Sequence, residues 1–479
     1  MNSEWAEHSV GDLFELINGY AFKSSDFKNC GIPVIKIKNV KAGAFIDDNF
    51  DFVDPDFLIS RSDKQPKQGD LLITMSGNRH DGSRETWVGK VTWFNQGKNY
   101  LVNQRVGILR LRDSGGFNAR FLAYQLSSDA FQDHFIAVAT SSGGQANLSP
   151  NQIKEMILRV PGKKIQDQIA TILGEIEDKI DLNHRINQTL EAMAQAIFKS
   201  WFVDFDPVKA KIAAIEQGED PLRAAMRAIS GKTDAELDQM PREHHDQLAA
   251  TAALFPDAMQ ESELGAIPKG WMGGAVGDLA EVTIGGDWGK DQPEDGEYVQ
   301  AVCLRGVDLE HLRVTGDCPK APVRWVKKNS IEKRQIQNFD LLIGGSGAGP
   351  CGRPLYASPL IAELVDHPVI YSNFVKRFRC KHSSQAIYLE HILWEMFNGG
   401  GIQNYINGTS VPNLNDKGLM VHPIVLPESQ LLKEFERISQ NWFKNLYSQE
   451  SKTLSGLRDT LLPKLLSGEL SVADLEVPA

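Results

Sequence analysis

An internal duplication spans most of the 479-residue chain and restricts its fold more than any other feature of the sequence. Short matches recur in the same order at a nearly constant offset of about 266 residues, far beyond the period of a solenoid repeat. The chain is therefore expected to contain two copies of a whole domain followed by a helix. The matched pairs are Trp5 and Trp271, residues 10–13 and 276–279 (VGDL), residues 70–73 and 340–343 (DLLI), Asn147 and Asn413, and Pro161 and Pro427.

Each copy begins with a β-rich stretch and ends with a helix. β-branched and alternating runs bounded by Gly, Asn and Asp are typical of strands, and in the first copy they occur at residues 32–37, 70–75 and 106–111. A short helix is expected at 117–127, with its counterpart at 386–397. The predicted fold class is α+β, with two duplicated mixed α/β domains, each followed by a long helix.

The residues after Pro161 carry the clearest periodicity. Apolar residues step by four and three, the 3.5-residue period of a coiled-coil seam, and Lys179 and Asn183 interrupt it. Such polar seam residues lower stability but fix register. In the second copy the steps from Trp442 to Leu454 indicate a stutter. The predicted seam comprises Ile169, Ile172, Ile176, Ile186, Leu190, Met193 and Ile197 in the first copy and Phe435, Ile438, Trp442, Leu454, Leu457 and Leu461 in the second.

An alternative is that each long helix packs only on its own domain. A helix of roughly 33 residues is about 50 Å long, which exceeds a small domain, so much of its apolar stripe needs another helix. The obvious partner is the duplicate helix.

The net charge of -11 is concentrated between the copies. Residues 204–266 hold 13 acidic and 6 basic residues, whereas the larger blocks are nearly neutral. Neutral blocks imply modest electrostatic affinity for nucleic acid, so a DNA-binding role would need positive surface from partner subunits. The predicted division assigns 1–160 and 267–426 to the two domains, 161–205 and 427–479 to the long helices and the C-terminal tail, and 206–266 to an acidic connector.

The motifs of an enzyme that acts on DNA are not found in the sequence. There is no Asn-Pro-Pro or Asp-Pro-Pro element, and residues 231–233 (GKT) fail as a phosphate loop because position 226 is Met226. We expect the glycine-rich residues 344–350 to form a mobile surface loop, and His244 and His245 to be surface residues without a third metal ligand. No catalytic residue and no metal site is therefore predicted.

The cysteines and the apolar runs bear on the cellular compartment. The five cysteines are scattered without a Cys-x-x-Cys pair, which favours a reducing cytoplasm over a disulfide framework or a zinc site. The N-terminal residues do not form a signal peptide, and no apolar run approaches the roughly 20 residues that span a bilayer. We expect a cytoplasmic protein that does not bind membranes.

Basic and amide residues gather between the predicted strands of each copy. Arg and Lys can bind guanine edges or phosphates, and Asn and Gln can pair with adenine in the major groove. For any single residue a solvated surface position is the simpler interpretation, but two such sets on duplicated domains suit a bipartite DNA site. The candidate DNA-binding residues are Lys36, Lys38, Asn78, Arg79, His80, Arg84 and Arg105 in the first copy and Arg305, Arg324, Arg334, Arg353, Lys376 and Arg377 in the second.

Three segments resemble the specificity subunits of type I restriction–modification systems. Residues 457–470 (LRDTLLPKLLSGEL) are similar to the C-terminal signature of that family, and residues 197–207 (IFKSWFVDFDP) and 262–271 (SELGAIPKGW) to its central segments. The resemblance covers essentially the whole chain. It departs where the family usually has Glu-Gln after the helix-initiating proline, because this chain has QDQ at 166–168 and SQ at 429–430.

The resemblance implies two target-recognition domains that each read half of a split, asymmetric DNA site, and two long helices that form an antiparallel coiled coil and fix the gap. Two methyltransferase subunits would dock there and methylate adenine with S-adenosylmethionine. Restriction subunits would add ATP- and Mg-dependent translocation and cleavage. None of these cofactors or activities would belong to this chain, which would be a non-catalytic DNA-recognition subunit for antiphage defence.

Two other hypotheses stay open at this point. The chain could be a non-catalytic coiled-coil scaffold, which a sequence-selective, salt-dependent DNA footprint from the reconstituted complex would exclude. It could also be a fused DNA methyltransferase with unrecognised motifs, which methyl transfer by the purified chain alone would support.

Overall fold

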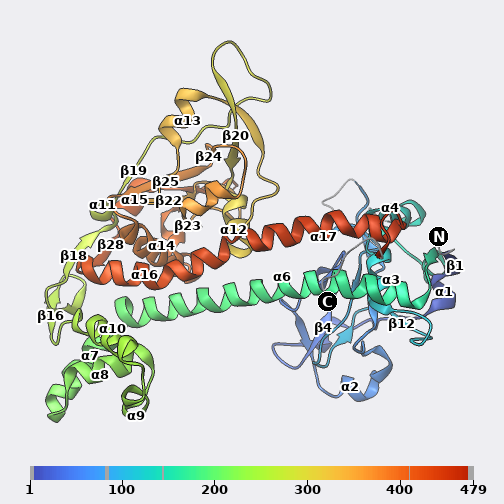
Figure 1. Ribbon diagram of the computed structural model, residues 1–479, viewed down its shortest axis with the longest axis horizontal. Helices are drawn as coiled ribbons and strands as arrows, with labels where there is room; N and C mark the ends of the chain where they lie inside the picture. Colours follow the sequence, from blue (N-terminus) through green and yellow to red (C-terminus); the bar gives the residue numbers. More distant parts are fainter. Residues whose placement is uncertain (1–4, 81–85, 143–144, 409, 473–479) are drawn as a thin grey trace. The chain divides into compact units, whose positions relative to one another are not determined.

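The computed structural model (Figure 1) describes residues 5–80, 86–142, 145–408 and 410–472. Its contacts group the chain into two compact units, each considered by itself below. Unit 1 combines Met1–Lys179 with Leu454–Ala479, and unit 2 is Ile180–Thr453. The mixture of helices and strands in both units confirms the α+β class, while the five-part division of the chain stays a prediction.

The central sheet of unit 1 is antiparallel, with strand order β10-β8-β12-β2. Its strand β8 is buried over its whole length because it is a continuous apolar run. Successive side chains of a strand point to opposite faces, so Leu71 and Ile73 join the core beneath the helices, while Leu72 joins a second core. The strands are β2 Phe14–Asn18, β8 Leu71–Thr74, β10 Val91–Trp93 and β12 Val106–Leu111.

Unit 1 also contains a second sheet and, after the last strand of the central sheet, three short helices. The second sheet has the order β11-β4-β7-β3, and β11 runs parallel to β4. Helix α3 supplies Phe121 and Leu122 to the core beneath the central sheet. These elements are β3 Phe27–Lys28, β4 Ile32–Ile35, β7 Asp51–Val53, β11 Leu101–Val102, α3 Ala119–Leu126, α4 Asp129–Val138 and α5 Pro150–Lys154.

The central sheet of unit 1 recurs strand for strand in unit 2, whereas the second sheet of unit 2, β21-β20-β24, has three strands instead of four among the described residues. The central sheet of unit 2 has the order β19-β25-β22-β23, which matches β2-β12-β8-β10, and β24 runs parallel to β20 as β11 does to β4. The elements are β19 Ala280–Val282, β20 Tyr298–Leu304, β21 Val323–Lys327, β22 Asp340–Gly344, β23 Pro354–Tyr356, β24 Val369–Tyr371, β25 Val375–Cys380, α12 Gly306–Thr315, α13 Lys328–Arg334, α14 Ser383–Asn398 and α15 Asp416–Met420.

A buried aspartate fixes the central sheet in both units. Arg110 donates to Asp70 in unit 1 (Nε–Oδ1 3.1 Å, Nη2–Oδ2 2.8 Å), and Arg379 donates to Asp340 in unit 2 (2.6 and 2.8 Å). Each carboxylate also accepts the backbone N–H three residues upstream, at 2.7 and 2.9 Å. Asp70 is 4% exposed and Asp340 is fully buried. The two copies predicted from the sequence therefore also share this set of hydrogen bonds.

One long helix begins in unit 1 and ends in unit 2. Helix α6 covers Lys163–Phe198, 36 residues without interruption. The second long helix is divided into α16 (Ser429–Leu446) and α17 (Gln449–Ser467), with Tyr447 in a non-helical conformation between them. The break falls inside the stutter predicted between Trp442 and Leu454, which explains why the apolar steps change there.

Helix α6 pairs with the second long helix in antiparallel order within unit 2. Phe198 near the end of α6 lies 5.8 Å from Phe435 (ring centroids), early in α16. Earlier in α6, Asn183 donates from Nδ2 to Glu450 Oε2 and Ser451 Oγ, both at 3.2 Å. Within unit 1 the first turns of α6 share a core cluster with the last turns of α17. The predicted polar register residue Asn183 therefore has partners on the facing helix.

The buried side of α6 differs in part from the predicted seam. Ile186 and Met193 are 40% and 55% exposed, whereas Asn187 and Ala194, one residue further on, are 4% and 3% exposed. On the facing helix Leu457 is 44% exposed. The apolar pattern does not decide between two adjacent stripes on a helix with 3.6 residues per turn, so the buried stripe of α6 lies one residue beyond the predicted positions 186 and 193.

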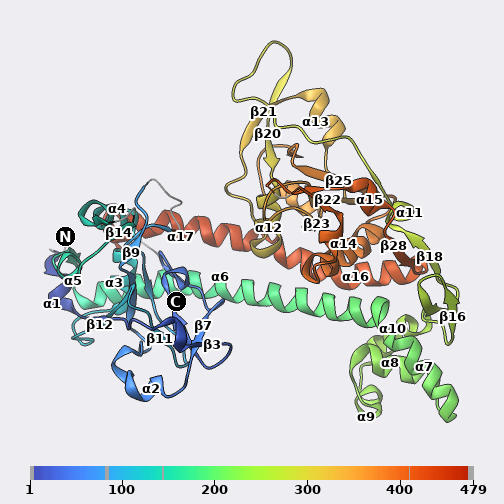
Figure 2. The same ribbon diagram turned by 180° about the vertical axis from the view of Figure 1, so that it is seen from behind.

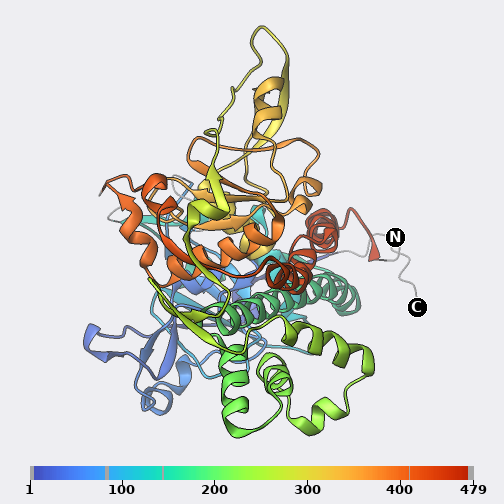
Figure 3. The same cartoon turned by 90° about the vertical axis from the view of Figure 1, so that its left-hand side faces the viewer.

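The acidic connector folds as a helical bundle (Figure 3, green). A small core of Ala225, Met226, Leu237 and Ala252 holds it together, and Thr251 Oγ1 donates to Glu434 of α16 at 3.0 Å. Several of its acidic residues pair with arginines inside the bundle, so part of the charge excess is internally neutralised. The helices are α7 Asp206–Gln217, α8 Pro221–Ser230, α9 Asp234–Asp238 and α10 Arg242–Ala253.

Replacing the buried carboxylate should destabilise unit 2. In Asp340→Asn, Arg379 keeps its charge and loses its partner, and we expect the free energy of unfolding to fall by about 3 kcal/mol. Urea denaturation followed by tryptophan fluorescence measures the change. The control Asp63→Asn, at a carboxylate that is 66% exposed, should change stability by less than about 0.5 kcal/mol. Equal effects of the two variants would contradict the role given to Asp340.

Candidate nucleic-acid interface

In unit 1, three segments meet where strand β8 ends. The backbone N–H of Met75 donates to Arg105 O (2.8 Å), and Leu148 N–H donates to Met75 O (2.9 Å). Strand β9 (Ser76–Gly77) pairs with β14 (Gln145–Asn147), as Figure 2 shows. We call residues 76–80, 103–105 and 145–147 edge 1. Edge 1 thus gathers four of the candidate DNA-binding residues, Asn78, Arg79, His80 and Arg105.

The side chains of edge 1 differ in how free they are to bind a ligand. Arg105 is exposed, and its guanidinium has no ion-pair partner among the residues that the structure describes. His80 is 56% exposed at its side chain, lies 3.0 Å from Asp133 and packs edge-on against Trp87. Asn78 Nδ2 donates to Thr86 Oγ1 (3.0 Å), and Arg79 donates to the carbonyl of Ala139. Arg105 and His80 are therefore the accessible donors.

Lys36 and Lys38 lie next to edge 1. Asn103 N–H donates to Ile35 O at 3.0 Å, which brings the start of the 103–105 loop beside Lys36. Both ammonium groups contact Asp51, at 2.7 and 3.8 Å, and the Lys36 hydrogen bond holds the pKa of Asp51 below its usual value. Lys36 also lies over the Phe27 ring. Arg84 is outside the described residues.

In unit 2 the same backbone frame recurs where strand β22 ends. Gly345 N–H donates to Phe374 O (2.7 Å), and Leu414 N–H donates to Gly345 O (2.9 Å). These bonds match those of Met75 in unit 1. We call residues 345–347, 372–374 and 411–413 edge 2. The glycine-rich loop, expected to be mobile, is tied to its neighbours by these bonds and by Gly347 N–H to Pro412 O (3.1 Å).

Glycines allow a close backbone approach at both edges. A Cβ on Gly19 would lie 2.1 Å from Asn103 O, and a Cβ on Gly286 would lie 2.1 Å from Ser372 O. Since real side chains do not tolerate such distances, both positions need glycine for the loops to pass. The loops of both edges are thus set by backbone packing rather than by their own side chains.

Most of the candidate DNA-binding residues in unit 2 make contacts within the fold and do not form an accessible surface. Arg377 is 3% exposed, and its guanidinium donates to Thr283 Oγ1 (2.7 Å) and Gln335 O (3.0 Å). This burial argues against a direct contact of Arg377 with DNA, because position 377 of β25 faces the interior. The neighbouring Lys376 faces outward and pairs with Asp416 at 3.1 Å, and the assignment of both residues to DNA stays a prediction.

The other four unit 2 candidates are engaged within their own domain. Arg305 pairs with the buried Asp308, Arg324 with Asp291, and Arg353 with Glu310. Arg334 donates to Gly285 O and Ser330 Oγ, both at 2.7 Å. Their assignment to DNA stays a prediction.

Two exposed residues of edge 2 were not among the candidate DNA-binding residues predicted from the sequence. Phe374 is 58% exposed and Val411 is 62% exposed. The candidates were selected for charge and amide groups, which gave no reason to choose a phenylalanine or a valine. Phe374 occupies the frame position of Arg105, so the two edges present different chemistry on one framework.

Each domain also binds α6 through an arginine. In unit 1, Arg120 Nη2 lies 2.9 Å from Asp178 Oδ1 and 3.3 Å from Glu177 Oε2. In unit 2, Arg313 is 3% exposed, donates from Nε to Glu191 Oε1 (2.9 Å), and also pairs with Glu390 of α14. These contacts attach the domain in each unit to the same helix.

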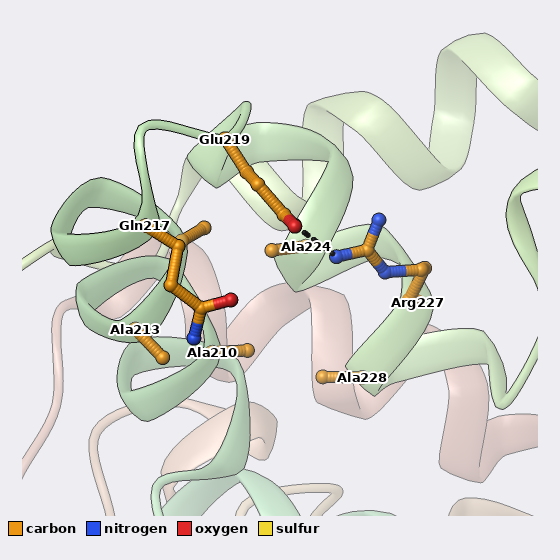
Figure 4. Close-up of a pocket in the computed structure, with 8 residues that line it drawn as sticks. Ala210, Ala213, Gln217, Glu219, Ala224, Arg227 and Ala228 are labelled. Carbon is orange, nitrogen blue, oxygen red and sulfur yellow. Dashed lines mark hydrogen bonds and ion pairs between the residues drawn. The ribbon is translucent and has the colours of Figure 1, made fainter.

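Among the residues that the structure describes, no group of three or more His, Cys, Asp or Glu could hold a metal ion. A cavity of about 410 Å³ between α7 and α8 is lined mostly by alanine, with one ion pair of Arg227 and Glu219 at 3.2 Å (Figure 4). Within the same residues, no helix has the length and apolar character needed to cross a bilayer.

Comparisons with known proteins agree with this organisation. The family model for the type I restriction modification DNA specificity domain matches residues 2–192. The type I restriction enzyme HindI specificity subunit of Haemophilus influenzae is 29% identical over 98% of this chain and all of the relative. The MjaIX specificity subunit of Methanocaldococcus jannaschii is 23% identical over 98% of this chain and 95% of the relative.

A solved structure shares the fold. The S subunit of a type I restriction–modification system from M. genitalium superposes with a TM-score of 0.52 at 14% identity, over 97% of this chain and 96% of that chain. At this identity the likeness concerns the fold alone.

The accessible arginine of edge 1 should contribute to DNA affinity. Because Arg105 can bind a guanine edge or a phosphate, Arg105→Ala should lower the affinity of the assembled complex for its target about tenfold. Fluorescence anisotropy with a labelled duplex measures this. Arg377→Ala should instead lower the melting temperature, and a stable Arg377 variant with weakened DNA binding would reverse the two roles.

Proposed function

We propose that this chain, a specificity subunit of the type I restriction–modification family, selects a split DNA sequence through edge 1 and edge 2. The family model and the relatives confirm the family and the non-catalytic class predicted from the sequence. The observation that carries the proposal is the repeated frame, in which the same backbone hydrogen bonds hold different side chains. Two edges that share a backbone frame but differ in their side chains suit two half-sites of different sequence.

Helix α6 supports a fixed gap between the half-sites. It is continuous over 36 residues, which is about 54 Å of helix at 1.5 Å per residue. Arg120 binds it at Glu177 and Asp178, and Arg313 binds it at Glu191. A recognition domain anchored at each of these points would hold its half-site at a set distance, as rigid dimers do on palindromic sites.

The exposed face of α6 supports docking of partner subunits. Leu182, Ile186 and Met193 are 44%, 40% and 55% exposed, and their spacing of four and seven residues places them on one side of the helix. Rows of exposed apolar side chains mark protein interaction surfaces. In this proposal two methyltransferase subunits bind the helices and restriction subunits complete the complex. S-adenosylmethionine, ATP and Mg²⁺ belong to those partners.

Charging this exposed face should release the methyltransferase without unfolding the chain. The double variant Ile186→Asp/Met193→Asp should abolish co-purification with the modification subunit, because two carboxylates would be buried in the interface. Pull-down and size-exclusion chromatography measure the assembly. Gln188→Asp, on the opposite side of the same helix, is the matched control and should assemble normally. Unimpaired assembly of the double variant would place the docking surface elsewhere.

Shortening both long helices should shorten the gap in the recognised sequence. Removing one heptad from α6 between Lys179 and Leu190, and one from the facing helix between Ser448 and Arg458, takes about 10.5 Å from each. The gap should fall by about three base pairs, at 3.4 Å per base pair. Methylation-sensitive sequencing of host DNA reads the gap directly. Methylation at the original spacing would refute the fixed-gap model.

A further inference from the structure

Edge 2 presents an apolar surface where edge 1 presents cations. Phe374 and Val411 flank the loop at Gly345–Gly347 from its two sides, since Gly345 N–H binds Phe374 O and Gly347 N–H binds Pro412 O. Their exposed fractions of 58% and 62% are high for residues of this size. Exposed apolar side chains that cluster on one edge indicate a binding surface rather than chance exposure.

The frame gives this apolar pair a definite position. The carbonyl of Phe374 accepts from Gly345 as the carbonyl of Arg105 accepts from Met75, so residues 374 and 105 are equivalent. The glycines at 345 and 347 carry no side chain, and of the three loop residues only Ser346 does. In the proposed complex, Phe374 therefore has the position in the second half-site that Arg105 has in the first.

We infer that Phe374, supported by Val411, reads the 5-methyl groups of thymine in the second half-site. The inference rests on the proposed function. In the major groove, thymine alone presents a methyl group, and apolar contact with Phe is a known way to recognise it. Arg105 can instead donate to guanine, which has acceptors and no methyl group. The two edges therefore recognise different base groups, although the same backbone hydrogen bonds hold both edges.

The polar neighbours of edge 2 agree with a nucleic acid at this place. Lys376 is 36% exposed at its side chain and pairs with Asp416, so its ammonium lies close to the loop and can exchange a carboxylate for a phosphate. Asn413 Nδ2 donates to Val411 O at 2.9 Å, which holds the valine in the loop. The apolar side chains of edge 2 are thus accompanied by a cation, Lys376, that can contact the DNA backbone.

Substitution of thymine by uracil tests the inference, because uracil keeps every pairing group and removes only the methyl. The assembled complex is titrated with duplexes that carry its target, found by methylation sequencing, with one thymine at a time replaced. In the half-site that Arg105→Ala does not affect, at least one uracil should weaken binding about fourfold, the value of one buried methyl group. Phe374→Ala should weaken binding to the thymine duplex and abolish the uracil effect.

Controls separate this inference from the proposed function. Val421→Ala, an apolar residue of unit 2 that is 74% exposed and outside edge 2, should leave both affinities unchanged. Uracil sensitivity that survives in Phe374→Ala, or loss of the methyltransferase subunit from that variant, would overturn the inference while wild-type selectivity upholds the proposed function. If the wild-type complex shows no sequence preference at all, the proposed function fails with it.

Discussion

The pairing of α6 with α16 and α17 is the constraint on which the rest of the structure depends. A helix of 36 residues with one apolar side has more surface to bury than a small domain can cover. Its first turns share a core with the end of α17 in unit 1, and its last turns pack on α16 in unit 2. Each unit therefore contains residues of both long helices, and neither recognition domain is complete without them.

Stability and specificity are carried by different parts of each recognition domain. The buried Asp70–Arg110 and Asp340–Arg379 pairs and the backbone bonds at the strand ends are shared by both units. Side chains such as Arg105 and Phe374 project from this frame without taking part in it. Substitutions at the edges should therefore cost little stability, since exposed positions contribute little to folding, and in the proposed function they would change the sequence that is recognised.

The sequence predicted the organisation well because the organisation is repeated. Matches such as residues 10–13 with 276–279 identified two domains, and the apolar period after Pro161 identified the long helix. The side of that helix was harder to predict: Met193 and Ala194 both extend an apolar pattern, and only the position of the facing helix decides between them. The packing of the connector into a bundle was not predicted, because its small core of Ala225, Met226, Leu237 and Ala252 comes from separate short helices.

The recognition residues were the least predictable part of the protein. Arg377 and Lys376 are adjacent in sequence, yet one is buried against Thr283 and the other is exposed. Charge alone cannot separate them, because a buried arginine and a DNA-binding arginine look identical in a sequence. Conversely, Phe374 has no charge to attract attention. Its backbone equivalence with Arg105 is visible only in the hydrogen bonds of the two frames.

The amide of Asn183 has one further consequence. Its hydrogen bonds to Glu450 and Ser451 exist in a single alignment of the helices. A slip by one heptad would still pair apolar residues, but it would leave this amide among groups that cannot satisfy it. Purely apolar helices can pair in more than one alignment. The two hydrogen bonds of Asn183 therefore favour one alignment of α6 against α17.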